Sequence, residues 1–424
     1  MATRTAIGVA ALLVSCTVLG LAGTDLVLPA VPQLPDFLGG TVSQSQLVLA
    51  TFAAGTGIGL LLFGELGARL EHRRMLLVAM VLYGVLSGAA GLATSLPMLI
   101  ALRFLQGLAA ACAAVVAPGI VRALFDEQGA LRALGALGSI ESLAPAIAPI
   151  IGVWLFDAYG WTASFWVTAV AALVLSAAIA VLGKAIPEVV GNPSRLGYWL
   201  LLRSPVFQRY ALSQGFGLGA LLAFVFAMPT VFVVALGGDI TDFIIMQVSG
   251  ISTFIIAANL SSTVVARLGR EKTIYAGSLM VVIACAALAG YGLVGGREPL
   301  LIWILFLPFN AGFGLRGPPG FYSALQASGG DDARASALVI LYVMLVTAGA
   351  TALLAPWVTL GLLPAALAAT VLAFVSLLLL LRLPALPEAD GAEAGESVGS
   401  AYPSNGDAAD AQSDTDTGTV SGAP

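Results

Sequence analysis

Long apolar runs separated by short polar breaks dominate this 424-residue sequence. Many of the runs reach about 20 residues, the length at which a helix crosses the hydrocarbon core of a bilayer. Only 10% of the residues are charged, whereas a soluble protein carries about 25%. The chain is therefore predicted to be an all-α, multi-pass integral membrane protein.

Twelve spans are expected. Arg4 precedes the first apolar run, but the run continues beyond Cys16, which favours a first membrane helix over a cleaved signal peptide. The predicted spans are 6–30, 46–66, 75–93, 98–123, 133–156, 162–182, 207–236, 243–266, 273–294, 299–324, 334–357 and 360–381.

The Lys and Arg residues predict the orientation. With the N-terminus inside, the outer breaks hold only Arg297, and nearly all other bases fall in cytoplasmic breaks. Cytoplasmic loops of membrane proteins carry an excess of Lys and Arg. Both termini are therefore expected in the cytoplasm, and the protein in the cell (inner or cytoplasmic) membrane.

The longest break between spans divides the chain into two sets of six. Ala68-Arg69-Leu70 after the second span matches Ala266-Arg267-Leu268 after the eighth, 198 residues later. Internal repeats of this kind build transporters that rock around a central site. The expected parts are an N-terminal six-helix bundle, a cytoplasmic linker, a pseudo-symmetric C-terminal six-helix bundle and a disordered acidic tail, at 1–183, 184–206, 207–383 and 384–424.

Two ionisable residues lie inside the predicted spans at matching depth. Asp25 is near the outer end of the first span, and Arg103 is near the outer start of the fourth. A charge within a membrane is costly unless it finds a partner, so the two side chains are predicted to pair. Separate placement of each side chain at the interface is the alternative. In a pair, protonation of Asp25 would release Arg103 and give two states.

Three motifs resemble those of a known family. Asp25–Pro32 resembles the first-helix signature of the chloramphenicol and bicyclomycin resistance exporters, which are twelve-helix drug:proton antiporters of the major facilitator superfamily. Leu102–Gly107 resembles the fourth-helix motif of that superfamily, and Leu143–Gly152 resembles the fifth-helix motif that marks its antiporters. The resemblance implies the major facilitator fold and proton-coupled efflux by alternating access, with Asp25 and Arg103 as coupling residues.

The resemblance also implies conformational roles for Gly107 and for the fifth span. Pro145, Pro149 and Gly152 follow one another at spacings of four and three residues, near one helix face. Prolines bend a helix, and small residues allow close packing. Such a helix can seal one end of the transporter against the other half; ordinary packing without gating is the alternative.

The loop after the second span departs from the family pattern. The family usually has Gly-x-x-x-Asp-Arg-x-Gly-Arg-Lys, whereas this chain has Ala68 in place of the acid and Glu71 in place of the second glycine. Gly64, Arg69 and Arg73 remain candidate gating residues. Glu65 could replace the missing acid; the alternative is a plain basic loop that only sets orientation.

Two further charges are expected inside spans. Glu141 precedes Pro145 by four residues, and Arg316 directly precedes Gly317 in the tenth span. They are candidate substrate-contacting residues and a candidate second charge pair, with Phe309 and Asn310 as further cavity candidates. A structural role at an interface or a helix break is the alternative.

Composition excludes several other classes. The single histidine and three cysteines give no metal site, and no phosphate-binding loop is present. Asp331-Asp332 lacks the repeated acidic clusters of membrane prenyl transferases, so an enzyme is not expected. The expected partners are protons, a small-molecule substrate and the bilayer, with no nucleic acid and no cofactor besides the proton gradient, and the chain is expected to be a monomer. An uptake transporter and a non-transporting sensor are the alternatives to a multidrug efflux protein of antibiotic resistance.

Overall fold

The computed structural model describes residues 2–67, 69–126, 129, 133, 137, 140–141, 143–189, 197–329 and 331–386. Within these ranges the chain is helical with short connecting turns, and no strand occurs. The predicted all-α fold class is therefore confirmed. The predictions for Ala68, for linker residues 190–196 and for the acidic tail beyond residue 386 lie outside the described residues.

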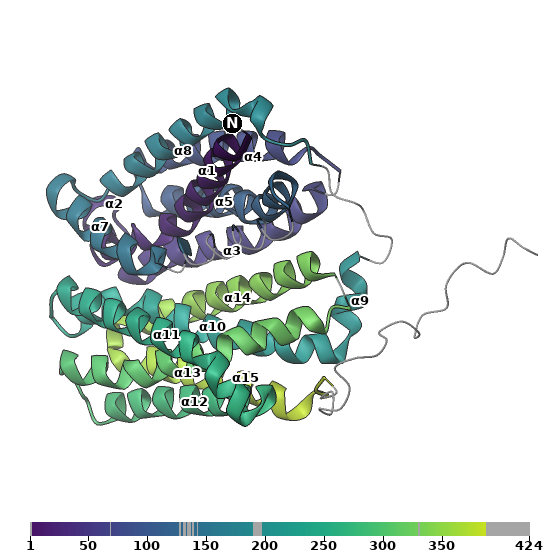
Figure 1. Ribbon diagram of the computed structural model, residues 1–424. Helices are drawn as coiled ribbons and strands as arrows, with labels where there is room; N and C mark the ends of the chain where they lie inside the picture. The colour runs from purple at the N-terminus through teal and green to yellow at the C-terminus, as the bar shows by residue number, and fades with distance from the viewer. Residues whose placement is uncertain are drawn as a thin grey trace, which may run out of the picture. The chain divides into compact units, whose positions relative to one another are not determined.

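In the described residues, the N-terminal half contains seven α-helices with two short 3₁₀ segments, η1 and η2 (Figure 1). They are α1 (Ala2–Asp25), η1 (Leu28–Gln33), α2 (Leu34–Leu38), α3 (Val42–Gly67), α4 (His72–Gly91), α5 (Leu96–Leu124), α7 (Ala144–Tyr159), α8 (Ala163–Val181) and η2 (Gly183–Ala185).

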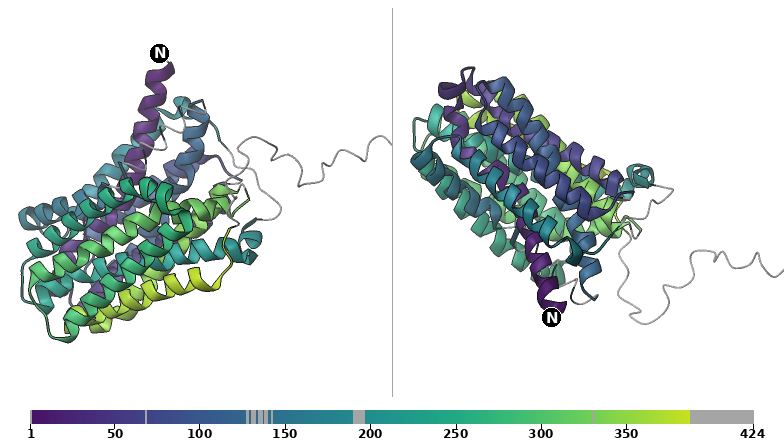
Figure 2. Two further views of the ribbon diagram at one scale, coloured as in Figure 1. Left: turned by 60° about the horizontal axis from the view of Figure 1, so that its bottom comes forward. Right: turned by 90° about the horizontal axis from the view of Figure 1, so that it is seen from above.

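In the described residues, the C-terminal half begins with a short helix and contains six long ones. Figure 2 shows them beside the helices of the first half from two further directions. The elements are α9 (Gly197–Arg203), α10 (Pro205–Thr230), the π segment η3 (Val231–Ala235), α11 (Ile240–Leu268), α12 (Arg270–Leu293), α13 (Pro299–Gln326), α14 (Asp332–Leu354), the 3₁₀ segment η4 (Ala355–Leu360) and α15 (Leu362–Arg382).

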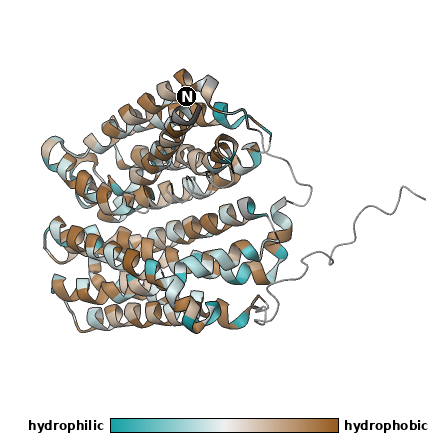
Figure 3. Ribbon diagram, viewed as in Figure 1, coloured by the Kyte–Doolittle hydropathy of each residue, from teal (hydrophilic) through white to brown (hydrophobic). Residues whose placement is uncertain are grey.

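Eleven of the described helices are long and apolar enough to cross a membrane, and the shorter apolar helix α7 is a twelfth candidate. Apolar residues cover most of each helix (Figure 3). The protein is therefore a multi-pass membrane protein. The division into two bundles with boundaries at 183 and 207 stays a prediction.

The α-helix of the first span ends before the predicted limit at residue 30, although the apolar span as a whole runs from Thr5 to Leu38. α1 stops at Asp25, where the amides of Leu26 and Val27 bond back to nearby carbonyls, and the chain continues as η1. Pro29 and Pro32 cause the change, because proline has no amide proton to donate to a continuing α-helix. Asp25 is thus the last residue of α1, at the joint between α1 and η1.

Glycines bring the central helices of each half into backbone contact. A Cβ atom at Gly107 of α5 would lie 2.1 Å from the Phe52 carbonyl oxygen of α3, and one at Gly55 would lie 2.0 Å from the Phe104 oxygen. Gly277 of α12 and Gly312 of α13 form a similar contact in the second half. Small residues allow this approach between membrane helices. Gly107, predicted as a gating residue, therefore has a clear packing role.

The two ends of the helical body differ. We call the end that holds Arg73, Arg209 and Glu271 the basic end. At the opposite end, one buried apolar cluster joins both halves and includes Leu28 and Leu34 with Phe224, Phe232 and Val358. A second cluster, around Phe63 and Ile120, lies in the N-terminal half alone.

A hydrogen bond also crosses between the halves at the end opposite the basic end. The Gln46 amide of α3 donates to the Thr230 hydroxyl of α10 over 2.6 Å, and both residues are buried. Together with the shared apolar cluster, this bond holds the two halves in contact there. The structure is therefore a state closed at that end.

The backbone contact at Gly107 predicts a large effect of a small substitution. Gly107→Ala should lower the free energy of unfolding by about 1–3 kcal/mol, because the added methyl group must push α3 and α5 apart. Gly290→Ala is the matched control, since nothing lies within 4 Å of a Cβ atom built at Gly290 of α12. Thermal unfolding of the purified variants in detergent measures the difference; equal midpoints would contradict the packing role of Gly107.

Candidate functional site

Arg103 is a fully buried cation that ties three helices together. It lies on α5 with 1% of its surface exposed. Its Nη1 donates to the Gly23 carbonyl of α1 over 3.0 Å and to the Gln106 side chain over 3.3 Å. Its Nε donates to the Val48 carbonyl of α3 over 3.3 Å. The predicted site residue therefore lies at the junction of α1, α3 and α5.

The position of Gly23 explains why its carbonyl accepts from an arginine. The last carbonyls of a helix have no intrahelical donor, and a cation near a helix C-terminus is favourable. In α1 the amides of Leu26 and Val27 bond to Ala22 and Thr24 and leave the Gly23 oxygen free. Arg103 thus caps the C-terminus of α1.

A chain of hydrogen bonds fixes the orientation of this cap. The Ser87 hydroxyl of α4 donates to the Tyr83 carbonyl over 2.7 Å, so its oxygen is free to accept from the Gln106 Nε2 over 2.9 Å. That bond turns the Gln106 carbonyl oxygen toward Arg103. The Phe52 ring adds a cation–π contact, with its centre 4.1 Å from the Arg103 guanidinium carbon.

Asp25 does not form the ion pair with Arg103 that the matching depth predicted. Its carboxylate is half-buried, and within the described part of the chain it makes no ion pair or side-chain hydrogen bond. Arg103 Nη2 is buried without a hydrogen-bond partner in the described part of the chain. The prediction of a direct pair is wrong in this state because the backbone at the end of α1 offers Arg103 a nearer acceptor.

The fifth-span motif packs on the turn after Asp25. A Cβ atom at Gly152 of α7 would lie 2.5 Å from the Leu26 carbonyl oxygen, which also accepts a hydrogen bond of 2.9 Å from Ser164 of α8. Pro145 is in the first turn of α7, where a missing amide proton costs little, and Pro149 is buried inside the helix. Gly152 and the two prolines therefore support the end of α1, and their predicted gating role is untested.

The candidate gating residues at the basic end have local partners. Arg69, just after α3, forms an exposed ion pair of 2.7 Å with Glu65, four residues earlier near the end of α3. Arg73 pairs with Glu71 over 2.9 Å and donates to the Gly183 carbonyl after α8. A Cβ atom at Gly64 would lie 2.5 Å from the Tyr198 hydroxyl of α9.

The structure does not bring the two charged cavity candidates, Glu141 and Arg316, together as a pair. Arg316 of α13 donates to the Ser376 and Ser213 hydroxyls, each over 2.8 Å, whereas the half-buried Glu141 lies beside Thr17 of α1. The predicted Glu141–Arg316 pair is therefore wrong in this state.

Phe309 and Asn310 are both buried. Phe309 packs against Phe224 and Phe306, and Asn310 donates to the Phe306 carbonyl of its own helix over 3.0 Å. A role in substrate contact stays a prediction for all four residues.

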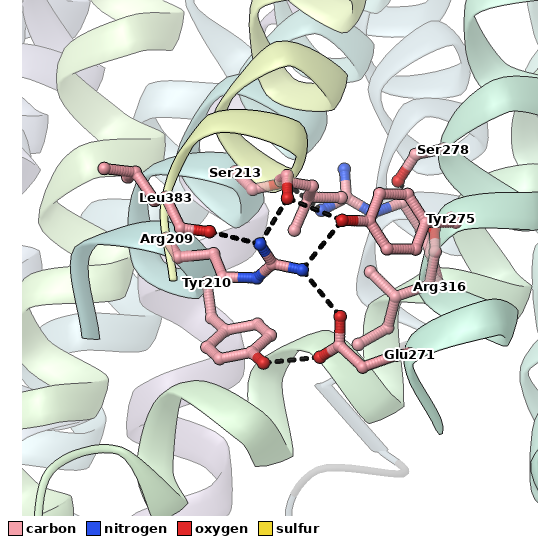
Figure 4. A network of polar contacts seen from close by, with 10 residues as sticks. Arg209, Tyr210, Ser213, Glu271, Tyr275, Ser278, Arg316 and Leu383 are labelled. Carbon is pink, nitrogen blue, oxygen red and sulfur yellow. Dashed lines mark hydrogen bonds and ion pairs between the residues drawn. The ribbon is translucent and has the colours of Figure 1, made fainter. Parts of the chain in front are cut away.

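Figure 4 shows a polar network at the basic end that sequence reasoning missed. Arg209 of α10 forms an ion pair of 2.7 Å with Glu271 of α12. The same guanidinium donates hydrogen bonds to the Tyr275 hydroxyl over 2.9 Å and to the Leu383 carbonyl after α15. Tyr210 donates to the same Glu271 carboxylate. The sequence gives little sign of this pair, since Arg209 and Glu271 each lie at a predicted span end, where charges are ordinary.

Comparison with known proteins gives consistent results. The sequence profile described as Major Facilitator Superfamily matches residues 13–352. A bicyclomycin resistance protein homolog of Haemophilus influenzae is 26% identical over 64% of this chain and 69% of its own length. A chloramphenicol resistance protein of Pseudomonas aeruginosa is 34% identical over 49% of this chain, and the chain spans about half of that relative's length, 50%.

Solved structures share the fold at low identity. An auto-inhibited POT family peptide transporter superposes with a TM-score of 0.70 at 12% identity, over 92% of this chain and 99% of its own. A D-xylose-proton symporter gives a TM-score of 0.67 at 16% identity, over 89% of this chain and 97% of its own. These similarities concern the fold alone.

The burial of the Arg209–Glu271 pair predicts that replacing Glu271 lowers the stability more than replacing Glu65, whose ion pair is equally short but exposed. Glu271→Gln should lower the free energy of unfolding by about 3–5 kcal/mol, because it leaves a buried guanidinium without its charge partner. Glu65→Gln, in an exposed pair of the same 2.7 Å length, should cost about 0.5 kcal/mol or less. Thermal unfolding in detergent tests this; a similar small shift for both variants would show that the network adds little.

Proposed function

Because the chain belongs to the Major Facilitator Superfamily, and is therefore a secondary transporter and not an enzyme, we propose that it exports small amphiphilic compounds in exchange for protons. In this proposal both termini and the basic end face the cytoplasm. The names of the relatives, resistance proteins for bicyclomycin and chloramphenicol, support drugs as the substrate class.

One observation carries the proposal: an unpaired carboxylate lies near an incompletely satisfied guanidinium at a chain joint. Asp25 has no direct partner within the described chain, and Arg103 Nη2 lacks an acceptor while Nη1 holds Gly23. A buried donor without a partner costs about 1–3 kcal/mol. A shift of the Asp25 carboxylate onto Nη2 would remove that cost, and protonation of Asp25 would reverse the shift.

The location of Asp25 connects this switch to alternating access. The segment that closes the end opposite the basic end starts two residues later, with Val27 and Leu28 in the cluster shared by both halves. A change in the partner of Asp25 therefore acts directly on the turn that carries these apolar contacts. We infer that the present state corresponds to a protonated Asp25 and a closed outer end, and that loss of the proton favours opening.

The substrate would meet mostly apolar walls, which suit compounds of varied structure. Among the candidate contacts, Glu141 is the one that is neither fully buried nor held in an ion pair within the described chain. Its carboxylate favours substrates that carry a positive charge.

Asp25→Asn tests the coupling role. In inside-out vesicles with an acid interior, the wild-type protein should accumulate a fluorescent amphiphilic cation, and the variant should do so at least about 100-fold more slowly, since amide replaces the proton carrier. Asp36→Asn is the matched control, because Asp36 is exposed on α2. This variant should accumulate the cation at the wild-type rate.

Two outcomes would contradict the proposal. Full gradient-driven accumulation by folded Asp25→Asn protein would make Asp25 a structural residue only. Accumulation driven by the opposite gradient would favour an uptake transporter, and binding of the compound without any gradient response would favour a sensor.

A further inference from the structure

A groove of about 350 Å³ lies at the basic end between the start of α4 and the end of α8. Two arginines and an apolar wall line it: Arg73, Arg74 and Leu77 from α4, with Ile179, Ala180 and Gly183 from the end of α8 and η2. α4 and α8 are both candidate membrane spans. The groove therefore lies where the hydrocarbon core gives way to the headgroup layer.

The surface next to the groove is lipid-facing. Val78, one turn beyond Arg74 on α4, is 59% exposed, and Val181 at the end of α8 is 83% exposed. Exposed apolar side chains of a membrane helix contact acyl chains. A chain entering the groove from the bilayer would thus find apolar contacts first and the arginines last.

The charges of the groove are only partly neutralised. Arg74 is 79% exposed in its side chain and contacts Glu71 through Nε over 2.7 Å, which leaves its terminal nitrogens without a described partner. Arg73 shares the same Glu71 carboxylate over 2.9 Å and approaches the exposed Glu188 at 3.7 Å. The Glu71 carboxylate thus serves two guanidinium groups, and the terminal nitrogens of Arg74 are the ones left available.

Helix stability does not explain these two arginines. The first turn of α4 holds both of them, although the N-terminus of a helix disfavours positive charge. The acid at this helix start is Glu71 at the N-cap, and both arginines share its carboxylate. An anion outside the chain would relieve this. Arginine binds phosphate through paired hydrogen bonds, and basic pockets between membrane helices at the cytoplasmic side bind anionic lipid headgroups.

We propose that this groove binds the headgroup of an acidic phospholipid. The phosphodiester lies on Arg74 and Arg73, and one acyl chain follows Leu77, Ile179 and Ala180 toward the exposed faces of α4 and α8. The apolar wall selects a lipid over a free phosphate ion. This site is separate from the end of α1 and does not depend on the transported substrate.

The test uses the full chain in bilayers of phosphatidylethanolamine with a minor fraction of phosphatidylglycerol. Native mass spectrometry after gentle release counts the lipids that remain bound. Arg74→Gln should reduce retained phosphatidylglycerol about five-fold, the equivalent of about 1 kcal/mol for one surface arginine. Arg69→Gln is the matched control, since Arg69 is exposed at the same end but outside the groove, and it should retain the wild-type amount.

A second variant tests the apolar wall without a change in charge. Ala180→Phe fills the groove beside the arginines and should also reduce retained phosphatidylglycerol, whereas binding of phosphatidylethanolamine stays low in every variant. Thermal unfolding identifies any variant that has lost its fold.

Three results would overturn the assignment. Wild-type retention in both Arg74→Gln and Ala180→Phe would place the lipid elsewhere, and an equal loss in Arg69→Gln would indicate a diffuse charge effect. Displacement of the lipid by inorganic phosphate alone would indicate a free-anion site. Lipid retention is measured without transport, so it stands or falls independently of the coupling role of Asp25.

Discussion

The arrangement at the end of α1 depends on a single buried guanidinium. Within an apolar interior, Arg103 must find acceptors, and the free carbonyl of Gly23 at the helix terminus is the nearest one. The same side chain bonds to α3 and, through Gln106, to Ser87 of α4. One residue of α5 thus fixes where α1 stops relative to α3, α4 and α5. The glycine contacts between α3 and α5 hold those two helices close together.

This arrangement connects the position of Asp25 to the apolar contacts that close the end opposite the basic end. Beyond Asp25 the chain passes directly into η1, whose apolar residues pack with Phe224 and Phe232 of the other half. Ser164 and Gly152 hold the intervening turn at the Leu26 carbonyl. A movement at Asp25 therefore cannot be absorbed by a loose loop; it must shift either the turn or the contacts between the halves.

The sequence was a good guide to the helices and a partial guide to the site. Apolar runs predicted nearly every span, and prolines explain why the α-helix of the first span gives way to a 3₁₀ segment after Asp25. Span counting placed Asp25 and Arg103 at similar depth, yet it gives no information about facing directions or backbone acceptors, so it paired Arg103 with a carboxylate instead of the Gly23 carbonyl. Arg209 and Glu271 were missed as a pair because charges at span ends resemble ordinary loop charges until the helices are packed.

The two halves use a buried arginine in different ways. Arg103 is the eighth residue of α5 and Arg316 the eighteenth of α13, so Arg316 lies about 15 Å closer to the basic end. Its acceptors are the hydroxyls of Ser213 and Ser376, which keep the same charge at any physiological pH. Glu271 in the adjacent network is already held by Arg209 and Tyr210. The C-terminal half therefore has a fixed internal tie, and under the proposed coupling a response to protons would come from the end of α1, where Asp25 lies near the unsatisfied guanidinium of Arg103.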